Sequence, residues 1–368
     1  MAERLEISPA MLEWAITRDG HSVQTYKANN ENVAAWIDGT KLPTEKQLEE
    51  FAKKIHVPFG YLFLPEPPIE SSPIPFFRGT ANDGHLDVNT YETVLTIQRR
   101  QEWLSDYLHD NDFEPCVFVG SVNKRMSTNT IVDKVRRLLN LPCNWAFHLA
   151  NSEQAVNRIV ELLEELGVFI AFNGVVGNNT KRPINVNECR GFVLVDPQAP
   201  FIFVNSADSK TAQLFTLIHE FAHILFGFSS GFGGDNWMEE NEIEKTCDKV
   251  AADFLVPEQT LRDNWMGIES SAKKFKVSPL VIARRAKELG IITYSDFIAF
   301  YNEYVANPVI TMRRNSGGNF NLVAKKRVGY TFAVHVQNAV RANQLSQVDA
   351  YRLTGLYGKT YSSFMSNL

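Results

Sequence analysis

The residues most able to do chemistry lie in the stretch FTLIHEFAHILFG, residues 215–227, where His219, Glu220 and His223 interrupt an apolar run. Two histidines four positions apart lie on the same face of a helix, one turn apart. Their ring nitrogens can bind a single tetrahedral metal ion, and the glutamate that follows the first histidine can reach a water molecule on that ion. This HExxH spacing predicts a zinc hydrolase site with two histidine ligands and Glu220 as the catalytic base.

The alternative is an ordinary core helix that carries two hydrogen-bonded histidines and a surface glutamate. The chain has only eight histidines, so a chance match to HExxH is rare, and the apolar background favours a helix that a domain core holds in place. We therefore interpret the stretch as one half of a metal site.

A catalytic zinc site needs a third protein ligand and keeps one position open for water. Residues 241–257, NEIEKTCDKVAADFLVP, have apolar residues at helical spacing, with Glu244 and Asp248 beside that apolar face. A carboxylate there is costly unless it is paired or bound to a metal. We predict one Zn²⁺ per chain, with Glu244 as the third ligand and Asp248 as the hydrogen-bond acceptor that orients a ligand histidine. Three nearby glutamates compete for the ligand role: Glu239, Glu240 and Glu242.

Such a site performs peptide hydrolysis, because the metal lowers the pKa of bound water to about 7 and Glu220 can carry its proton to the leaving amine. The strand-like run FIFVN, residues 201–205, directly precedes the motif helix. We expect this run to be a sheet edge that pairs with an extended substrate peptide. The oxyanion-stabilising residue stays open, with three candidates: Tyr294, Tyr301 and Arg190.

The elements around these motifs favour an α+β protein that is mostly α-helical. Helical patterns cover residues 86–110 and 152–167, and strand-like runs follow at 168–172, 191–196 and 201–205. The chain is mostly helical after the motif. We therefore expect a zincin-like metallopeptidase domain with a small sheet and a helical C-terminal region.

The sequence of the N-terminal 63 residues predicts several short helices joined by tight turns at Gly20, Gly39 and Pro43. A helix-turn-helix-like domain is the expected arrangement. Residues 64–77, LPEPPIESSPIPFF, hold five of the 16 prolines in the chain, which excludes both helix and central strand. We predict four parts: a helix-turn-helix-like domain (1–63), a proline-rich linker (64–85), the peptidase domain (86–305) and a C-terminal basic, helical region (306–368).

Composition sets broad limits on the class of protein. Hydrophobic residues make up 44% and charged residues 21%, as in soluble globular proteins. No apolar run has the length of a membrane span, and the acidic N-terminus lacks the apolar segment of a signal peptide, so we expect a cytoplasmic protein without a membrane partner. The four cysteines form no CxxC pair, which favours free thiols over a cysteine-built zinc site.

Charge is unevenly distributed in this chain of net charge −5. Residues 304–348 contain no Asp or Glu but six basic side chains: Arg313, Arg314, Lys325, Lys326, Arg327 and Arg341. Such a surface can meet an acidic partner or a nucleic-acid backbone, or it can be a solvated face. The sequence leaves these alternatives open.

Two stretches resemble a known family. Residues 174–227, which end in the HExxH helix, and residues 243–257, IEKTCDKVAADFLVP, resemble the ImmA/IrrE family of bacterial zinc metallopeptidases. The N-terminal ISPAMLEWA and WIDGTKLPTEKQLEEFAKKIHVPFGYLFLPEPP resemble the XRE-type helix-turn-helix module that often precedes such a peptidase. The resemblance implies a cytosolic endopeptidase that cleaves a partner transcriptional repressor of the XRE type in a stress, mobile-element or toxin–antitoxin system. It carries the zinc-ligand roles to His219, His223 and Glu244 and the base role to Glu220.

The N-terminal module departs from a typical DNA reader. Its presumptive recognition helix, NNENVAAW, has no Arg or Lys, and residues 1–63 hold seven basic and nine acidic side chains. Strong DNA binding depends on phosphate neutralisation, so docking or oligomerisation is favoured, although Asn29, Asn30 and Asn32 can contact bases. A second helix-turn-helix-like stretch, residues 271–292, is expected to be helical packing. The rival function is a DNA- or protein-binding regulator or antitoxin, with a toxin partner, whose zinc site is not used for proteolysis.

Overall fold

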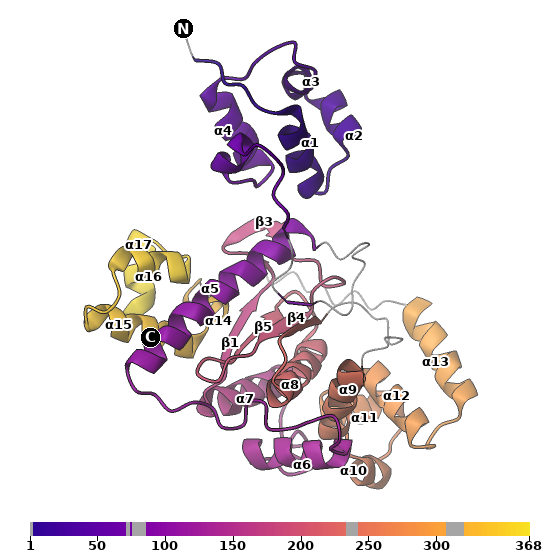
Figure 1. The fold of residues 1–368 in the computed structure, drawn as a ribbon. Coiled ribbons are helices and arrows are strands. Elements are labelled where there is room, and N and C mark those ends of the chain that lie inside the picture. The colour runs from indigo at the N-terminus through magenta and orange to yellow at the C-terminus, as the bar shows by residue number, and fades with distance from the viewer. Residues whose placement is uncertain (1–2, 71–73, 76–85, 233–241, 307–319) are drawn as a thin grey trace. The chain divides into compact units, whose positions relative to one another are not determined.

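The computed structural model describes residues 3–70, 74–75, 86–232, 242–306 and 320–368. The chain divides into two compact units, Met1–Pro73 with Ala81–Glu92 and Ile74–Thr80 with Thr93–Leu368. Helices dominate and the main sheet is small and mixed, which confirms the α+β, mostly helical class (Figure 1). The finer four-part division of the sequence stays a prediction.

The smaller unit is a compact set of short helices. A capping box at Thr44 and Gln47 starts the last α-helix, because each residue's side chain bonds the other's backbone N–H. Trp36 and Phe51 pack edge to face in its core, with ring centroids 6.0 Å apart. The elements are α1 (Pro9–Arg18), α2 (Val23–Asn29), α3 (Glu31–Ile37), α4 (Glu45–Lys54) and the 3-10 helix η1 (Phe59–Phe63).

The presumptive recognition helix at residues 29–36 is interrupted, because α2 ends at Asn29 and α3 begins at Glu31. Lysines from elsewhere in the unit bond to this stretch: Lys54 Nζ lies 3.0 Å from Asn30 Oδ1, and Lys41 Nζ lies 2.9 Å from Asn32 Oδ1. The fold therefore supplies positive charge that the helix itself lacks. The XRE-type assignment of this unit stays a prediction.

The larger unit is built on a four-stranded sheet in the order β1-β5-β4-β6. Figure 1 labels three of these strands, β1, β5 and β4. Strands β1 (Phe169–Asn173) and β5 (Phe201–Asn205) are parallel, whereas β4 (Gly191–Leu194) is antiparallel to β5 and to β6 (Ser230–Phe232). Three of these strands match the three runs expected from the sequence. The sequence missed β6 and the small hairpin of β2 (Val175–Val176) and β3 (Asn179–Pro183).

The expectation that residues 201–205 form a sheet edge is wrong. Strand β5 pairs with β1 on one side and with β4 on the other, so both of its hydrogen-bonding sides are occupied. All five of its residues are buried, and such a continuous apolar run is typical of a central strand covered on both faces. Among the described strands, the edges of this sheet are β1 and β6.

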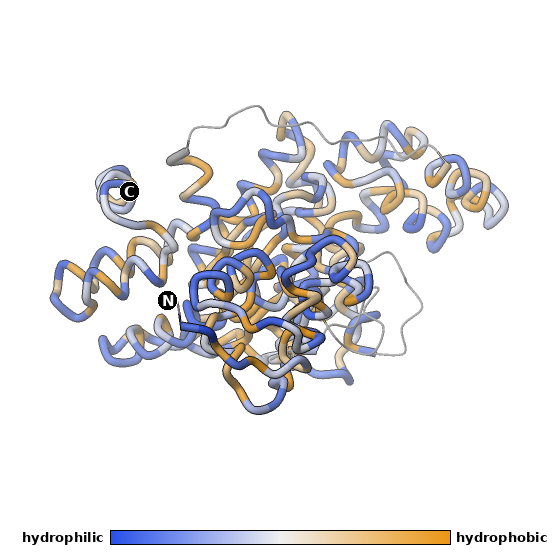
Figure 2. The backbone as a smooth tube through the Cα atoms, turned by 90° about the horizontal axis from the view of Figure 1, so that it is seen from above, coloured by the Kyte–Doolittle hydropathy of each residue, from blue (hydrophilic) through white to orange (hydrophobic). Residues whose placement is uncertain are grey.

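Alternate residues of the strands point into two different apolar cores. Val193 and Ile202 belong to the core on the face of the motif helix, whereas Phe192 and Phe203 belong to the core on the opposite face. Figure 2 shows hydrophobic and hydrophilic positions alternating along the helical parts of the chain, as amphipathic packing requires. The first face is covered by α6 (Thr128–Leu139), α7 (Ser152–Glu165), α8 (Lys210–Phe226), α9 (Glu242–Leu255), α11 (Ile268–Phe275) and α12 (Pro279–Glu288).

The opposite face is covered by α5 and by the C-terminal helices. One arginine of α5 forms hydrogen bonds with two of these C-terminal helices. The buried Arg100 guanidinium donates to the carbonyl oxygens of Leu353 at 2.8 Å and Arg327 at 3.0 Å, near the ends of α16 and α14. Burial lowers the pKa of Arg100 to about 10, which still leaves it charged at neutral pH. The helices on this side are α5 (Val88–Asp110), α14 (Phe320–Val328), α15 (Tyr330–Arg341), α16 (Gln347–Thr354) and α17 (Gly358–Met365).

Part of the basic region lies on α14. Lys326 is 3.8 Å from Glu153, and Arg327 donates to Asn178 at 3.1 Å, so two of its charges contact neighbouring elements. Arg313 and Arg314 lie outside the described residues.

Two expectations from composition can be compared with the structure. All four cysteines are free thiols, as predicted from their spacing. In the part of the chain that the structure describes, no helix has both the length and the apolar character needed to cross a membrane.

Candidate metal centre

Helix α8 carries the HExxH stretch and is positioned by caps at both of its ends. Ser209 is the N-cap, because its side chain accepts a hydrogen bond from the backbone N–H of Ala212. Gly227 ends the helix in the left-handed conformation with φ +80, where a glycine is favoured. Every residue from Gln213 to Phe226 is buried, so the motif lies in a rigid part of the fold.

Packing of α8 against α9 brings the three predicted metal ligands together. The Nε2 atoms of His219 and His223 lie 3.2 Å apart. The carboxylate of Glu244, on α9, reaches both rings, with Oε2 3.3 Å from His219 Nε2 and Oε1 3.0 Å from His223 Nε2. All three side chains are buried, so the cluster is closed to bulk solvent on most sides.

These three side chains fit a zinc ion. Donors about 2.0–2.2 Å from a tetrahedral zinc ion lie about 3.3 Å from one another, close to the spacings among His219, His223 and Glu244. Two imidazoles and one carboxylate are also the donor set of a catalytic zinc site, which leaves a fourth position for water. The chemistry and the spacing of the donors therefore agree.

Asp248 lies one turn along α9 from Glu244 and contacts the far side of the first histidine. Its Oδ1 atom is 3.0 Å from His219 Nδ1. A proton on Nδ1 donates to this carboxylate, which leaves Nε2 as a lone-pair donor toward the cluster. The position predicted for Asp248 as an orienting partner is therefore the position that the structure gives it.

Glu220 is completely buried, and neither of its carboxylate oxygens has a hydrogen-bond partner among the described residues. Gly191 on β4 lies beside it: a Cβ atom there would be 3.6 Å from Glu220 Oε1 and only 2.5 Å from Thr216 Cγ2. The same Cβ would be 2.7 Å from the carbonyl oxygen of Phe203. Only glycine allows β4 to approach α8 this closely, a role of Gly191 that the sequence analysis missed.

The buried carboxylates of the cluster favour the binding of a cation. Burial raises the pKa of Glu220 to about 8. Burial alone would lower the pKa of His219, but hydrogen bonds to Asp248 and Glu244 outweigh it and raise that pKa to about 10. Burial also lowers the pKa of His223, whereas hydrogen bonds from both rings hold the pKa of Glu244 below its usual range despite its burial. At neutral pH these pKa values place one proton on His219 and one on Glu220 in the metal-free protein, and a divalent ion would supply the positive charge in their place.

The structure separates Glu244 from one of its three competitors for the ligand role, Glu242. Glu242 is exposed at the start of α9, whereas Glu239 and Glu240 lie outside the described residues. Of the oxyanion candidates, Tyr294 is 68% exposed and shares α13 (Tyr294–Ala306) with Tyr301, a helix that has no buried residue. Arg190 lies 3.6 Å from Asp208. The oxyanion role stays open among the three.

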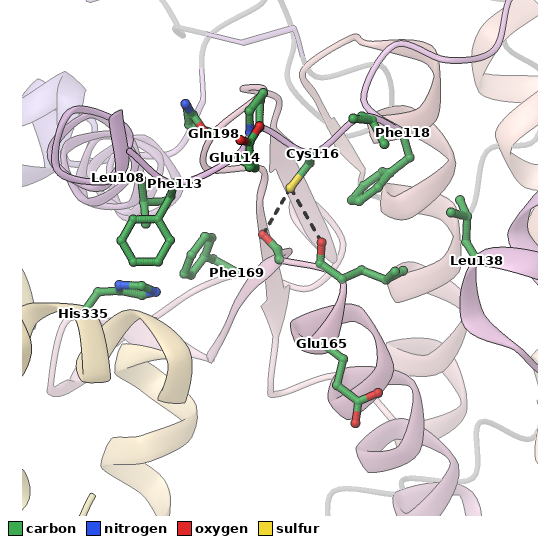
Figure 3. A pocket seen from close by; sticks show the side chains of 14 residues that line it. Leu108, Phe113, Glu114, Cys116, Phe118, Leu138, Glu165, Phe169, Gln198 and His335 are labelled. Carbon is green, nitrogen blue, oxygen red and sulfur yellow. Dashed lines mark hydrogen bonds between the residues drawn. The ribbon is translucent and has the colours of Figure 1, made fainter. Parts of the chain in front are cut away.

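A separate pocket of about 470 Å³ lies elsewhere in the larger unit. Figure 3 shows His335 facing Phe113 and Phe169 on one side of it. Cys116 on the other side contacts the carbonyl oxygens of Leu166 and Gly167. Burial and the charge of Asp196 raise the pKa of the Cys116 thiol, which makes it a poor nucleophile. None of the five predicted site residues lines this pocket.

Comparison with known proteins supports the metal centre independently of its geometry. Residues 163–287 match the Peptidase_M78 family model, the IrrE N-terminal-like domain. The matched range includes the four-stranded sheet, α8 and α9, and a metal, typically zinc, is implied for this family. A search of curated proteins gave no match. Residues 163–287 therefore form a Peptidase_M78 domain, the IrrE N-terminal-like type that matches the ImmA/IrrE family.

Proposed function

We propose that the protein is a zinc-dependent endopeptidase with His219, His223 and Glu244 as its metal ligands. The observation that carries this proposal is the convergence of the three donors within 3.0–3.3 Å of one another. The buried carboxylate of Glu220 beside them supports the role of a base. The match of residues 163–287 to a metallopeptidase family supports the same reading.

A bound zinc ion would supply a Lewis acid that polarises the substrate carbonyl and activates water. Glu220 would accept a proton on its carboxylate and deliver it to the leaving amine, and its pKa of about 8 in the metal-free protein lies in the range where a side chain can do both. Asp248 would hold the ring of His219 in one orientation through the contact at Nδ1. Gly191 would leave the space that Glu220 needs between β4 and α8.

The substrate that we propose is a partner regulatory protein, namely an XRE-type transcriptional repressor in a stress, mobile-element or toxin–antitoxin system. This step depends on the family resemblance. It is consistent with a metallopeptidase domain that follows a separate, compact N-terminal unit.

The substitution Glu220→Gln tests the proposal. The amide keeps the shape of the side chain but cannot accept the proton, so cleavage of an XRE-type repressor should fall at least about 100-fold. Zinc content should stay at one ion per chain, because Glu220 is not a ligand. Glu242→Gln, an exposed position on α9, is the matched control. Equal cleavage by wild-type protein and Glu220→Gln would refute the proposed mechanism.

A regulator that acts by binding is the second candidate function. The observation that favours it is the pair of lysines, Lys41 and Lys54, bonded to Asn32 and Asn30 beside α3. If binding alone is the function, the regulatory readout should survive Glu220→Gln and fail in the double substitution of Lys41 and Lys54 to Gln.

A further inference from the structure

Strand β6 forms one edge of the sheet and pairs with β4, the strand that lies beside Glu220. Its neighbour β4 contains Gly191, the residue beside Glu220. In the antiparallel register, Gly191 is opposite Phe232 and Phe192 is opposite Gly231. The strand follows the C-cap of α8 within three residues. An extended peptide added outside β6 would lie two strand spacings from β4, about 10 Å.

This outer edge is already occupied by a segment of the same chain. The backbone N–H of Gly231 donates to the carbonyl oxygen of Pro75 at 2.9 Å. Ile74, the preceding residue, is 4% exposed and belongs to the same apolar core as Phe192 and Phe203. Ile74 and Pro75 belong to the larger unit, whereas the residues up to Pro73 belong to the smaller one. Residues 74 and 75 are thus anchored to the sheet by one buried side chain and a backbone hydrogen bond.

Ile74 is buried, whereas the other isoleucine of the proline-rich stretch is exposed. Ile69, the other isoleucine of residues 64–77, is 95% exposed. Pro75 has no N–H, so it accepts a hydrogen bond from β6 but cannot donate one back. Proline at such a position ends strand pairing and protects the edge from uncontrolled association. A peptide whose residue at this position has a backbone N–H can form the hydrogen bond that Pro75 cannot. Such a peptide can therefore displace Ile74–Pro75 from β6.

We propose that the outer edge of β6 is a docking site for an extended segment of a protein substrate, and that Ile74–Pro75 occupies it in cis. The docked segment would present an apolar side chain where Ile74 now lies and a carbonyl acceptor to Gly231. Substrate docking then requires displacement of the cis segment, which makes that segment autoinhibitory. The docking site is inferred from the contacts of Gly231 and Ile74. The autoinhibitory role of Ile74–Pro75 rests in addition on the proposed peptidase function.

The test uses the full-length protein and a fluorescent peptide of residues 68–80, PIESSPIPFFRGT. All variants carry Glu220→Gln, so that the peptide is not cut. The substitution Ile74→Asp removes the apolar anchor of the cis segment. The variant that carries it should therefore bind the peptide at least tenfold more tightly than the Glu220→Gln parent. Ile69→Asp is the matched control and should bind like the parent. A peptide with Asp in place of its own Ile74 should not bind.

Hydrogen exchange at the Gly231 amide gives a readout that does not depend on zinc or cleavage. Exchange should be faster in Ile74→Asp than in Ile69→Asp, and added peptide should slow it again. The milder Ile74→Ala should show the same change at smaller amplitude, which separates release of the segment from general unfolding. Equal peptide affinity and equal exchange in the Ile74 and Ile69 variants would overturn the docking site.

The two proposals can fail separately. If the peptide binds as expected but no variant with Glu220 restored cleaves protein, the docking surface stands and the peptidase function is wrong. If cleavage depends on Glu220 but does not rise in Ile74→Asp, the peptidase function stands and the autoinhibition is wrong.

Discussion

The Nδ1 atom of His219 lies 3.0 Å from Oδ1 of Asp248, on the side of the ring away from the cluster. This pair connects α8 to α9 through a residue that is not itself a metal ligand. It fixes which ring nitrogen is available to a metal, so the two helices must keep their relative position for the site to exist. Several expected outcomes follow from this arrangement and from its neighbours.

Substitution of Asp248 by Asn should weaken zinc binding about 10- to 100-fold, because the amide loses the charge that polarises the ring of His219. Competition against a zinc-binding dye, with the far-ultraviolet spectrum as a fold check, measures this change. Glu242→Gln, an exposed carboxylate-to-amide change on the same helix, should leave zinc affinity at the wild-type value. Unchanged affinity in Asp248→Asn would mean that the pair is structural only.

Zinc affinity should depend on pH through His219. Its neighbours raise the pKa of this ring to about 10 in the metal-free protein, so at neutral pH the ring carries a proton that a metal must displace. Affinity should therefore fall about tenfold for each unit that pH decreases between 8 and 6, for each proton displaced. Calorimetry in two buffers of different ionisation enthalpy should detect proton release. Binding without release would show that the ring is neutral before zinc arrives.

Gly191→Ala should damage the site from the β4 side. The new Cβ would lie 2.5 Å from Thr216 Cγ2 and 2.7 Å from the carbonyl oxygen of Phe203, and such overpacking costs about 1–3 kcal/mol of unfolding free energy. Urea unfolding measures the loss, and cleavage should fall with it because the contact with Glu220 shifts. Gly60→Ala is the control, since nothing lies within 4 Å of its added Cβ. Equal stability of the two variants would contradict the close approach of β4 to α8.

Arg100→Met should loosen the C-terminal helices. It removes charged hydrogen bonds to the carbonyl oxygens of Leu353 and Arg327, a loss of about 2–3 kcal/mol of unfolding free energy. Limited proteolysis should then cut earlier between α14 and α17 in this variant. Arg99→Met, at the exposed neighbouring position, is the matched control. Indistinguishable protease sensitivity of the two would show that the guanidinium does not hold these helices.

Much of the candidate site could be predicted from the sequence because its signals are local. The spacing of His219 and His223 needs only the geometry of one helix, and Glu244 needs only a second apolar helix with a carboxylate beside its buried face. The order of the strands is not local, however. The prediction of an edge at residues 201–205 is wrong because five apolar residues do not indicate which strands they pair with.

Two other features were beyond sequence reasoning for the same physical reason. Strand β6 has three residues, including a glycine, and its existence depends on pairing with β4. The role of Gly191 depends on how closely β4 approaches α8. Such contacts between distant segments carry no periodic signal, so they appear only in the folded chain.

The smaller unit closes its own core with residues that lie between Leu5 and Leu62 alone. Its apolar side chains need nothing that is encoded later in the gene. Recombination that exchanged the opening codons for those of another short helical module would therefore leave the chemistry encoded downstream unaltered. Such an exchange would replace the smaller unit in one genetic event and would change none of the residues of the candidate metal centre.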